Sequence, residues 1–539
     1  MRISEYEAFV RNSDWTGKTS SEERIRIARY GVAAEVGSLA AAIKRKILHH
    51  PAEHWATANE EIIEELGDCL WYTTQLSLID SDGGLAEVIA ADLNALPKEI
   101  EDRPQFLVAL APGNYQKFLQ LASNIKRKSG RATLNEYQSA AILTARTDGK
   151  ELLDVCVTRL MLYATSIMSR QFPDREYHLK DDILKFTPNR TLGMLLWHVS
   201  AVAKIYSLPL DFVAQENQKK IESIANLGGR PPTPLYDRVE GIPVSQQFPD
   251  TFEITYLSTS AKRLQMYYKG RPLGDELDDN STTEDGYRFH DALHLANAAI
   301  LGWSPVLRSL MGLKRKYDPS KDNAEDGARA RIVEEAIVKA AHSEALRAAQ
   351  SEGLEIQDAR KRLFSEAGQI PYPFLKLVRT YADGLEVQKS EPWEWQKAIV
   401  EGQRLYVKLL EHKQGTITVN LLERSVSFKP LVIADFRGPV VASTIEGFEH
   451  DLNSEQGVGK EVFSSVEKRA ILKLLGISDL SAQVEGVEIS YSESNELSIK
   501  LYNQPQFKAW EKSIVGFRRE WTQVGKSWLC LMMAIGAPD

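Results

Sequence analysis

The stretch "RYGVAAEVGSLAAAIKRKI" (29–47), followed by "EEIIEELGDCLWY" (60–72), predicts two helices that pack together. Apolar residues recur at spacings of three and four, and β-branched runs are few. Glu65 and Asp68 are three residues apart, so both side chains project from one face of the second helix. Glu35 lies on the first helix, and an antiparallel pair of helices could bring it opposite those two carboxylates.

The acidic side chains of this region allow two interpretations. With Glu61 one turn before Glu65, carboxylates crowd one helix face, which is costly unless a divalent cation neutralises them. Mg²⁺ prefers hard oxygen ligands and keeps several waters, which suits a substrate with a polyphosphate tail. Lys44 and Lys46 follow on the first helix and could meet phosphate oxygens. Alternatively, the same glutamates form a solvated acidic face that binds nothing.

The composition is that of a soluble globular protein. The 539 residues suffice for three or four domains, and 43% are hydrophobic and 26% charged. The net charge of −8 is modest and the Lys and Arg residues are dispersed, so no duplex nucleic acid is expected as a partner. No signal-peptide core is found, and no run approaches the roughly 18 apolar residues of a membrane span. Cys69, Cys156 and Cys530 lack CxxC spacing, which argues against disulfides and structural zinc and favours a cytoplasmic protein.

Four domains are expected along the chain. Residues 20–225 have a helical pattern, and the proline- and glycine-rich segment 226–243 is the clearest boundary. After it "FEITYLS" predicts one strand, helical patterns resume, and alternating half-buried strands follow a second boundary near 411–416. The fold class is therefore mainly α, with a duplicated helical bundle, a second largely helical domain and a small α+β C-terminal domain. The expected domains are 1–103, 104–228, 240–415 and 416–539.

An internal repeat runs through the first half of the chain. Three segments return in the same order: "SLAAAIKRK" (38–46) as "QLASNIKRK" (120–128), "ELGDCLWY" (65–72) as "TLGMLLWH" (191–198), and "GLAEVIAADLNAL" (84–96) as "PLDFVAQENQKKI" (209–221). Three matches in one order favour a duplication. The alternative is a single helical domain with a long insertion at about 81–190.

In "AAEVGSLAAAIKRK" followed by "EELGDCLWY", the first repeat resembles the MazG family of all-α nucleoside triphosphate pyrophosphohydrolases. The family motif is E-E-x-x-E, a spacer, and E-x-x-D. The resemblance implies a helical bundle that dimerises and binds Mg²⁺ through the motif acids, with Mn²⁺ as a substitute. It also implies cleavage of a nucleoside triphosphate into monophosphate and pyrophosphate. The matching positions are Ala34, Glu35, Ser38, Glu65 and Asp68.

Two of these five positions depart from the family pattern. Ala34 replaces the first acid and Ser38 the last, so three of the usual metal-binding acids remain. The resemblance assigns the metal to Glu35, Glu65 and Asp68, and the Ser38 hydroxyl can accept a hydrogen bond from a metal-bound water. The expected centre is therefore an incomplete version of the family's centre.

The catalytic base and the base-binding side chain are also candidates. A carboxylate among Glu35, Glu61 and Glu65 would orient or deprotonate the attacking water, and Glu61 could replace a missing ligand. Trp71 could stack a nucleotide base, although an aromatic residue at helical spacing is more often part of the core.

The second repeat is not expected to hold Mg²⁺. When the two repeats are aligned through "IKRK", Lys117 and Gln120 occupy the positions of Glu35 and Ser38. Aligned through "LGxxLW", those on the second helix become Thr191 and Met194. Lysine and methionine side chains are not hard-oxygen ligands.

The second repeat keeps one feature of the family. Its "ENQKKI" resembles the N-x-x-K of the family's closing helix, which implies Asn217 and Lys220 as phosphate contacts. The two repeats would then form a pseudo-dimer in which the first brings the metal and the second brings phosphate contacts.

A second possible metal site lies in the "FHDALH" segment. His290 and His294 are four residues apart on a predicted helix with Asp291 between them, a spacing that can place two imidazoles on one metal. Acidic partners are available in Asp326, Glu334 and Glu335, although two such histidines often only satisfy a buried polar network.

Residues 240–415 resemble the domain that follows the catalytic bundle in some MazG-like proteins.

The C-terminal module is faintly similar to holo-ACP-synthase-like phosphopantetheinyl transferases. The similarity lies in "VFSSVEKRAILKLLGI" and the strand patterns that follow, and it implies metal ligands at Asp435 and Glu467. The motif lysine is replaced by Val466, so a relic of the fold used for contacts is expected.

The sequence thus predicts a Mg²⁺-dependent pyrophosphohydrolase that acts on a nucleoside triphosphate, with no membrane partner and with a homodimeric assembly. The alternative is a catalytically degenerate nucleotide sensor or scaffold in a regulatory or defence role. A third hypothesis places the chemistry at His290, Asp291 and His294.

Overall fold

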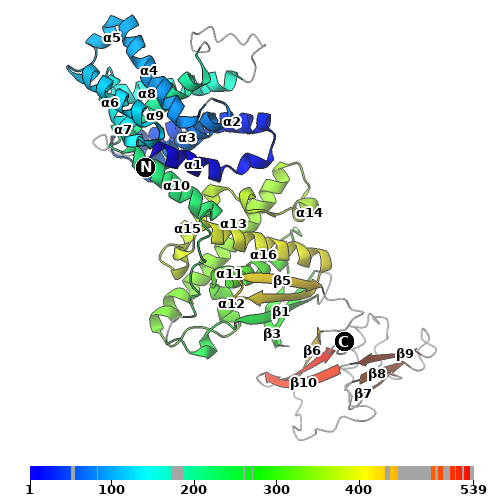
Figure 1. The fold of residues 1–539 in the computed structure, drawn as a ribbon. Coiled ribbons are helices and arrows are strands. Elements are labelled where there is room, and N and C mark those ends of the chain that lie inside the picture. Colours follow the sequence, from blue (N-terminus) through cyan, green and yellow to red (C-terminus); the bar gives the residue numbers. More distant parts are fainter. Residues whose placement is uncertain are drawn as a thin grey trace. The chain divides into compact units, whose positions relative to one another are not determined.

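The computed structural model describes residues 1–430 except 50–54, 82, 171–185, 239–240, 259–261, 270 and 283, and beyond residue 430 it describes the backbones of six strands. The chain divides into two compact units, Met1–Arg230 and Pro231–Asp539. The first is a bundle of helices, and the second contains helices packed on a sheet and then further strands (Figure 1). The mainly α fold class is confirmed.

The first unit contains ten α-helices in its described residues. Asn59 starts the helix that bears the ELGD sequence, because its side chain accepts a hydrogen bond from the Ile62 N–H at 2.9 Å. The helices are α1 (Ile3–Ser13), α2 (Ser21–His49), α3 (Glu60–Ile79), α4 (Gly84–Asp102), α5 (Pro104–Val108), α6 (Asn114–Lys128), α7 (Leu134–Ala141), α8 (Gly149–Ser169), α9 (Pro188–Ile205) and α10 (Leu210–Ala225).

These helices pack with an internal two-fold pattern. Helix α2 packs along α3 as α8 packs along α9, and α1 contacts α3 as α7 contacts α9. The closing helices are exchanged, because α4 packs on α9 while α10 packs on α3. The segments that precede α1 and α7 pair with each other at Arg2 and Thr133. This exchange makes the two halves a single unit rather than two separate bundles.

Side chains repeat the two-fold pattern at the crossings of α3 and α9. A Cβ added to Gly67 would lie 2.8 Å from the Asn217 Cβ, and one added to Gly193 would lie 2.8 Å from the Asp92 Cβ. Both glycines therefore let a closing helix approach closely. Two pairs of hydrogen bonds repeat the pattern. The Tyr6 hydroxyl donates to Asn217 as the Tyr137 hydroxyl donates to Asp92. The Trp71 indole donates to Ser13 as the Trp197 indole donates to Thr144. Such paired contacts are what an internal duplication produces.

The correspondence drawn through "IKRK" is wrong. Helix α8 takes the place of α2, because it packs on α9 and on α2 itself, whereas α6 packs on α7. Basic residues are favoured in the last turn of any helix by the helix dipole, so the run 126–128 at the end of α6 recurs for a local reason. Lys117 and Gln120 are therefore not the counterparts of Glu35 and Ser38.

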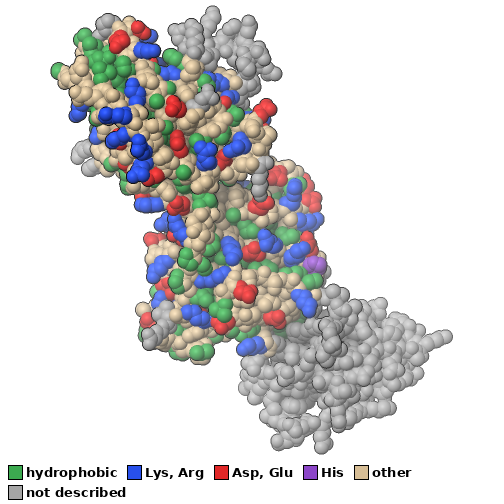
Figure 2. Space-filling model, viewed as in Figure 1, with side chains coloured by type: hydrophobic (Ala, Val, Ile, Leu, Met, Phe, Trp, Pro, Cys, Tyr) green, Lys and Arg blue, Asp and Glu red, His purple; other side chains and the backbone are tan. Residues whose placement is uncertain are grey.

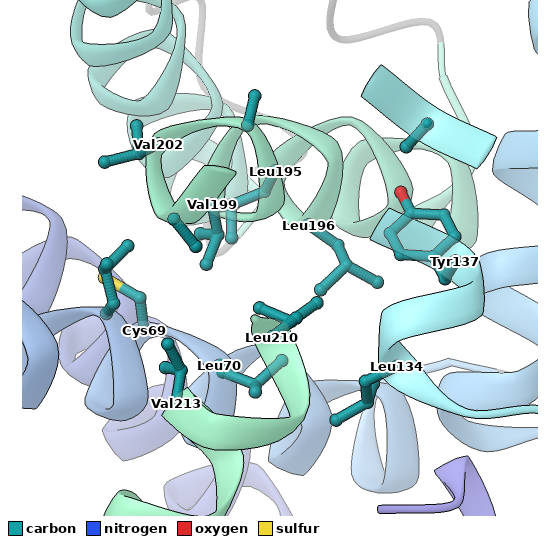
Figure 3. Close-up of a cluster of buried hydrophobic side chains, with 14 of the residues drawn as sticks. Cys69, Leu70, Leu134, Tyr137, Leu195, Leu196, Val199, Val202, Leu210 and Val213 are labelled. Carbon is teal, nitrogen blue, oxygen red and sulfur yellow. The ribbon is translucent and has the colours of Figure 1, made fainter. Parts of the chain in front are cut away.

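One hydrophobic core spans both halves of the first unit. Figure 3 shows side chains from α3, α7, α9 and α10 meeting in one cluster. Because neighbouring core positions come from different repeats, neither half buries its apolar face alone. The labelled residues are Cys69, Leu70, Leu134, Tyr137, Leu195, Leu196, Val199, Val202, Leu210 and Val213.

Gly193→Ala is expected to lower the free energy of unfolding by about 1–3 kcal/mol, because the new methyl group would overpack the α9–α4 crossing. It would meet the Asp92 Cβ at 2.8 Å and the Val88 carbonyl oxygen at 3.2 Å. The matched control is Gly37→Ala in α2, where nothing lies within 4 Å, and a gain of about 0.5–1 kcal/mol is expected there. Urea unfolding measures both changes, and equal stability of the two variants would contradict the close crossing.

The second unit contains a five-stranded antiparallel sheet of order β3-β2-β1-β4-β5. Helices α11 and α16 pack along each other and contact β4 and β5 (Figure 1). The strands are β1 (Thr251–Ser258), β2 (Leu264–Tyr268), β3 (Arg271–Leu277), β4 (Gly415–Asn420) and β5 (Ser425–Pro430). The helices are α11 (Asp291–Leu301), α12 (Pro305–Leu310), α13 (Ala328–Ser351), α14 (Ile356–Ala359), α15 (Tyr372–Ala382) and α16 (Pro392–His412).

This sheet crosses the boundary expected near 411–416. Strand β4 pairs with β1, with Ile254 opposite Ile417, so strands on either side of that boundary share one sheet. Alternation predicted the strands correctly, but strand pairing over such a separation leaves no local signal. Strands β2 and β3 were not predicted, although Leu264 and Met266 are both buried at strand spacing.

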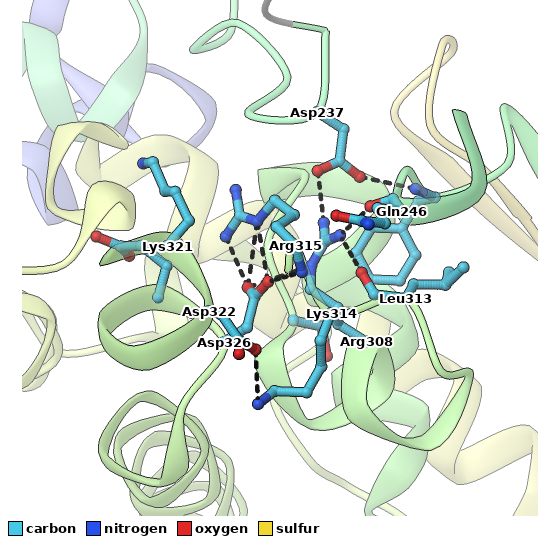
Figure 4. Close-up of polar contacts among 12 residues, drawn as sticks. Asp237, Gln246, Arg308, Leu313, Lys314, Arg315, Lys321, Asp322 and Asp326 are labelled. Carbon is cyan, nitrogen blue, oxygen red and sulfur yellow. Dashed lines mark hydrogen bonds and ion pairs between the residues drawn. The ribbon is translucent and has the colours of Figure 1, made fainter. Parts of the chain in front are cut away.

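A network of buried ion pairs ties the segments beside this sheet together (Figure 4). The Arg315 guanidinium donates to Asp326 at 2.7 Å and to Glu386 at 2.6 Å. Arg308 donates to Asp237 at 2.6 Å, and its Nε lies 3.4 Å from Asp326. Buried charges of this kind are retained only when they are paired and hydrogen-bonded.

Beyond residue 430 the described backbone forms two antiparallel sheets of three strands, ordered β10-β11-β6 and β7-β8-β9. The strands are β6 (Gly438–Glu446), β7 (Val487–Tyr491), β8 (Glu496–Leu501), β9 (Trp510–Val515), β10 (Phe517–Val524) and β11 (Ser527–Ala534). Asp435 and Glu467 lie outside the described residues.

Figure 2 shows one face of the molecule, and over its coloured part basic and acidic side chains are interspersed. This agrees with the dispersed Lys and Arg residues of the sequence. By length and composition α8 could cross a membrane, and 44% of its most apolar window is buried; α9 and α10 pass the same test only as a pair bent by 99°. One such helix gives no strong signal of a membrane protein.

Candidate functional site

The first candidate site lies where α2 faces α3. One carboxylate oxygen from each of Glu35, Glu65 and Asp68 lies within 4.8 Å of the others. The spacing of Glu65 and Asp68 places both on the side of α3 that meets α2, as the sequence predicts. We call this group the carboxylate cluster.

The cluster carries more negative than positive charge, because one ammonium group, that of Lys220, lies beside its three carboxylates. Partial burial and the charges of Glu35 and Asp68 raise the pKa of Glu65 to about 8. Burial and the charge of Asp68 also raise the pKa of Glu35. Three ionised carboxylates at this separation repel each other, so they favour a proton or a cation between them. A hard oxygen donor set that is short of positive charge fits a divalent ion such as Mg²⁺.

Helix α10 of the second repeat contributes two side chains that contact the carboxylate cluster. Lys220 Nζ donates to Asp68 Oδ2 at 2.5 Å and to Glu64 Oε1 at 3.0 Å. Asn217 Nδ2 donates to Asp68 Oδ1 at 2.9 Å, and the buried Tyr6 hydroxyl fixes the amide of Asn217 through a 3.0 Å hydrogen bond. The exchange of closing helices therefore brings the N-x-x-K residues of one repeat to the acids of the other.

Lys220 remains charged in this position. Burial opposes its charge, but Asp68 and Glu64 outweigh burial and raise the pKa of the ammonium group. The role of Glu64 was not predicted, although the signal was present in the doubled glutamate of "EELGD". The role of Tyr6 leaves no signal in the sequence, because it depends on the packing of α1 against α10.

Other predicted residues lie outside the cluster. Glu61 pairs with Arg45 on α2 rather than joining the three carboxylates. Lys44 is exposed, whereas Lys46 is buried with 5% of its surface exposed. Ser38 is half-buried one turn after Glu35 and adds no carboxylate to the cluster.

The stacking role expected for Trp71 is not supported by its position. Its side chain is 4% exposed and its indole N–H donates to the Ser13 hydroxyl at 2.9 Å. Tyr72 meets the Trp71 ring edge-on, at 4.9 Å between ring centroids. Trp71 therefore belongs to the core, because helical spacing places it on the inner face of α3.

The equivalent position in the second repeat has a different charge. Met194 stands where Asp68 stands in the first repeat and is buried. Beside it the Arg190 guanidinium pairs with Asp92 at 2.5 Å and with Glu99. An internal cation replaces the carboxylate cluster here, so this position is not suited to a divalent metal.

The comparisons with known proteins concern the second unit. Residues 232–432 match the family model of the MazG C-terminal domain, from just before β1 to just after β5. These residues are similar to the MazG C-terminal domain, and we use that name for them below. The resemblance to MazG-like proteins is confirmed over these residues, and the domain includes the strands β4 and β5 beyond residue 415. No curated protein and no solved structure matches the chain significantly.

The MazG C-terminal domain holds the second candidate site. His290 and His294 meet Glu335 of α13, with ligand atoms of all three within 4.8 Å of one another. Glu335 is one of the acidic partners expected from the sequence, whereas Asp291 is outside this group of three and its Oδ2 lies 3.9 Å from His290 Nε2. Asp326, another expected partner, instead pairs with the arginines of Figure 4.

Proposed function

We propose that the first unit is a Mg²⁺-dependent nucleotide pyrophosphohydrolase that splits a nucleoside triphosphate into monophosphate and pyrophosphate. The convergence of Glu35, Glu65 and Asp68 carries the proposal. The MazG C-terminal domain supports it, because that domain suggests a nucleotide pyrophosphohydrolase family. Glu35, Glu65 and Asp68 would hold the ion, with Mn²⁺ as a substitute, and Ser38 would contact a water on it.

The bound cation would neutralise phosphate charge and position the polyphosphate. Lys220 and Asn217 of α10 would contact the phosphate oxygens. Their donor groups lie against Asp68, one of the proposed metal ligands, and so lie beside the place where the phosphates would bind. Glu35 or Glu65 would take a proton from the attacking water as its oxygen bonds to phosphorus. The anhydride bond between the α- and β-phosphates would then break and pyrophosphate would leave.

The two repeats supply both sides of this site within one chain. Glu35, Glu65 and Asp68 come from the first repeat, and Asn217 and Lys220 from the second. Hydrolysis therefore does not require a second copy to complete the site, although the family resemblance predicts a homodimer. A cytoplasmic location fits the buried thiols of the described cysteines, Cys69 and Cys156.

A nucleotide sensor without catalysis is the second candidate. Ala34 and Ser38 favour it, since each removes an acid from the motif of the resembled family. A sensor would keep the carboxylate cluster, Lys220 and Asn217 for binding and would release no product. This role would fit a regulatory or defence protein.

The decisive experiment is to incubate the full chain with a panel of ribo- and deoxyribonucleoside triphosphates and Mg²⁺. Pyrophosphate release that stops when the metal is chelated is the expected result. Nucleotide binding by calorimetry without pyrophosphate release would instead establish the sensor. Release of single phosphates without pyrophosphate would contradict the proposed bond cleavage.

A further inference from the structure

We propose that the MazG C-terminal domain binds a divalent transition-metal ion, of the Zn²⁺ class, through His290, His294 and Glu335. The three side chains come from two helical segments, the start of α11 and the middle of α13. Their ligand atoms lie within 4.8 Å of one another without any rearrangement. This site is separate from the carboxylate cluster and does not depend on its function.

The ring orientation of His290 leaves its Nε2 free to bind. His290 Nδ1 lies 2.8 Å from the Tyr287 carbonyl oxygen, which can only accept a hydrogen bond. Nδ1 therefore carries the proton, and in the neutral ring the lone pair is on Nε2. The Tyr287 ring stacks on the imidazole at 4.2 Å between centroids and an interplanar angle of 1°, which holds its plane.

His294 has a carboxylate beside its other ring nitrogen, at ion-pair distance but without normal hydrogen-bond geometry. Its Nδ1 lies 2.9 Å from Glu334 Oε1, so the second nitrogen, Nε2, again faces the cluster. Glu334 is fully buried and is fixed by the Val306 N–H at 2.9 Å and by the Asn297 amide at 3.3 Å. A buried carboxylate behind a histidine is the usual outer partner of a metal ligand, because it sets the tautomer and raises basicity.

Both Nε2 atoms point at the carboxylate of Glu335. His294 Nε2 lies 3.5 Å from Oε1, and His290 Nε2 lies 3.8 Å from Oε2. Ligand atoms about 2.0–2.2 Å from a tetrahedral ion are separated by roughly 3.3–3.6 Å. The three ligand atoms, which lie within 4.8 Å of one another, would therefore move together by no more than about 1.5 Å on an ion.

Two polar groups at the site lack a normal hydrogen bond among the described residues. One is the His294 ring, which is 1% exposed, and the other is Asp291 Oδ2. Leaving such groups unsatisfied is costly in a buried position. An ion bonded to His294 Nε2 would satisfy the ring, and Asp291 could accept from a water on that ion.

The donor set indicates the class of metal. Two imidazoles and one carboxylate suit Zn²⁺ and related ions, whereas Mg²⁺ prefers oxygen ligands alone. Three protein ligands also leave a position open for water, unlike a closed structural site with four. Glu335 is half exposed, with 44% of its side-chain surface accessible, so solvent can reach the open position.

The test is a Co²⁺ titration of the full chain after removal of metal by a chelator, because Co²⁺ in such a site has visible absorption bands. One equivalent of Co²⁺ displaced by one equivalent of Zn²⁺ is the expected result. Glu335→Gln is expected to weaken binding by more than about 100-fold and Glu334→Gln by about 10- to 100-fold. His412→Ala, on an exposed histidine of α16, should leave the titration unchanged.

Glu335→Gln is the main variant because the half-exposed side chain of Glu335 can be changed with little effect on stability. His294→Ala would leave a cavity in the buried core and destabilise the domain. Absence of visible bands in the wild-type chain would overturn the proposal. Equal Co²⁺ affinity in the wild type and Glu335→Gln would also overturn it, since a simple buried ion pair of His294 would then account for the cluster. Circular dichroism confirms that each variant retains its fold.

Discussion

Asp68→Ala is expected to reduce Mg²⁺-dependent pyrophosphate release by more than about 100-fold, because the loss of a ligand exceeds the 10- to 100-fold cost of losing an outer partner. Asp68 is the residue that joins the two repeats at the site. It accepts from Lys220 at 2.5 Å and from Asn217 at 2.9 Å, and it lies beside Glu35 and Glu65. The variant removes one carboxylate. Lys220 and Asn217, the two proposed phosphate contacts, then lose the group that accepts their hydrogen bonds.

The fold is expected to survive this change. Removing one of three crowded carboxylates relieves repulsion, and Lys220 keeps its 3.0 Å contact with Glu64. We therefore expect the free energy of unfolding to change by less than about 1 kcal/mol. Loss of activity with an unchanged unfolding transition would assign the effect to the site.

The matched control is Glu60→Gln, an exposed acid in the first turn of the same helix. It should retain full activity, because it lies two turns from Asp68. Activity that survives Asp68→Ala would contradict the proposed site. If the wild-type chain binds nucleotide without hydrolysis, the same pair of variants reports on Mg²⁺-nucleotide affinity, which Asp68→Ala should again lower.

Arg315→Ala is expected to destabilise the MazG C-terminal domain by about 3–5 kcal/mol, because it removes the closest cation of the buried Asp326 carboxylate. Arg315 is 1% exposed and is shared between Asp326 and Glu386. Asp326 is itself 1% exposed, and Arg308 at 3.4 Å is already engaged with Asp237 (Figure 4). Glu386 would keep its 2.8 Å contact with Lys321, so the expected cost comes mainly from Asp326.

Thermal and urea unfolding of the full chain measure this effect. Arg347→Ala removes an exposed partner of Glu344 one turn away, and it should cost less than about 0.5 kcal/mol. Similar losses in the two variants would contradict a buried network that stabilises the domain. Retained pyrophosphate release in Arg315→Ala below its unfolding temperature would show that the two units act separately.

The internal two-fold pattern explains why one repeat carries the candidate site and the other does not. Asn217 and Asp92 occupy equivalent places against Gly67 and Gly193. In the first repeat Lys220 pairs with Asp68 and Glu64, and the carboxylates of Glu35 and Glu65 remain crowded beside them. In the second, Arg190 supplies a positive charge from within and pairs with Asp92. The first repeat therefore has the carboxylates of the proposed metal site, whereas the second has an internal ion pair at the equivalent place.

Much of the carboxylate cluster was predictable from local spacing. The three-residue interval between Glu65 and Asp68 fixes their common face, and the antiparallel packing of neighbouring helices brings Glu35 within reach. The same reasoning failed for the "IKRK" alignment, because a basic last turn is common to many helices. For Trp71 the sequence allowed both a stacking role and a core position, and its buried side chain agrees with the core position, which is the more frequent one at helical spacing.

The sequence by itself determined most of the helical and strand segments, the shared face of Glu65 and Asp68, and the four-residue spacing that brings His290 and His294 together at the start of α11. These features depend on the periodicity of the backbone, which acts over a few residues. The tertiary structure alone decided that Lys220 meets Asp68, that Glu335 rather than Asp291 joins the histidines, and that β4 lies beside β1. Such contacts join residues far apart in the chain, and side-chain packing and strand register select them among many arrangements that the local pattern allows equally.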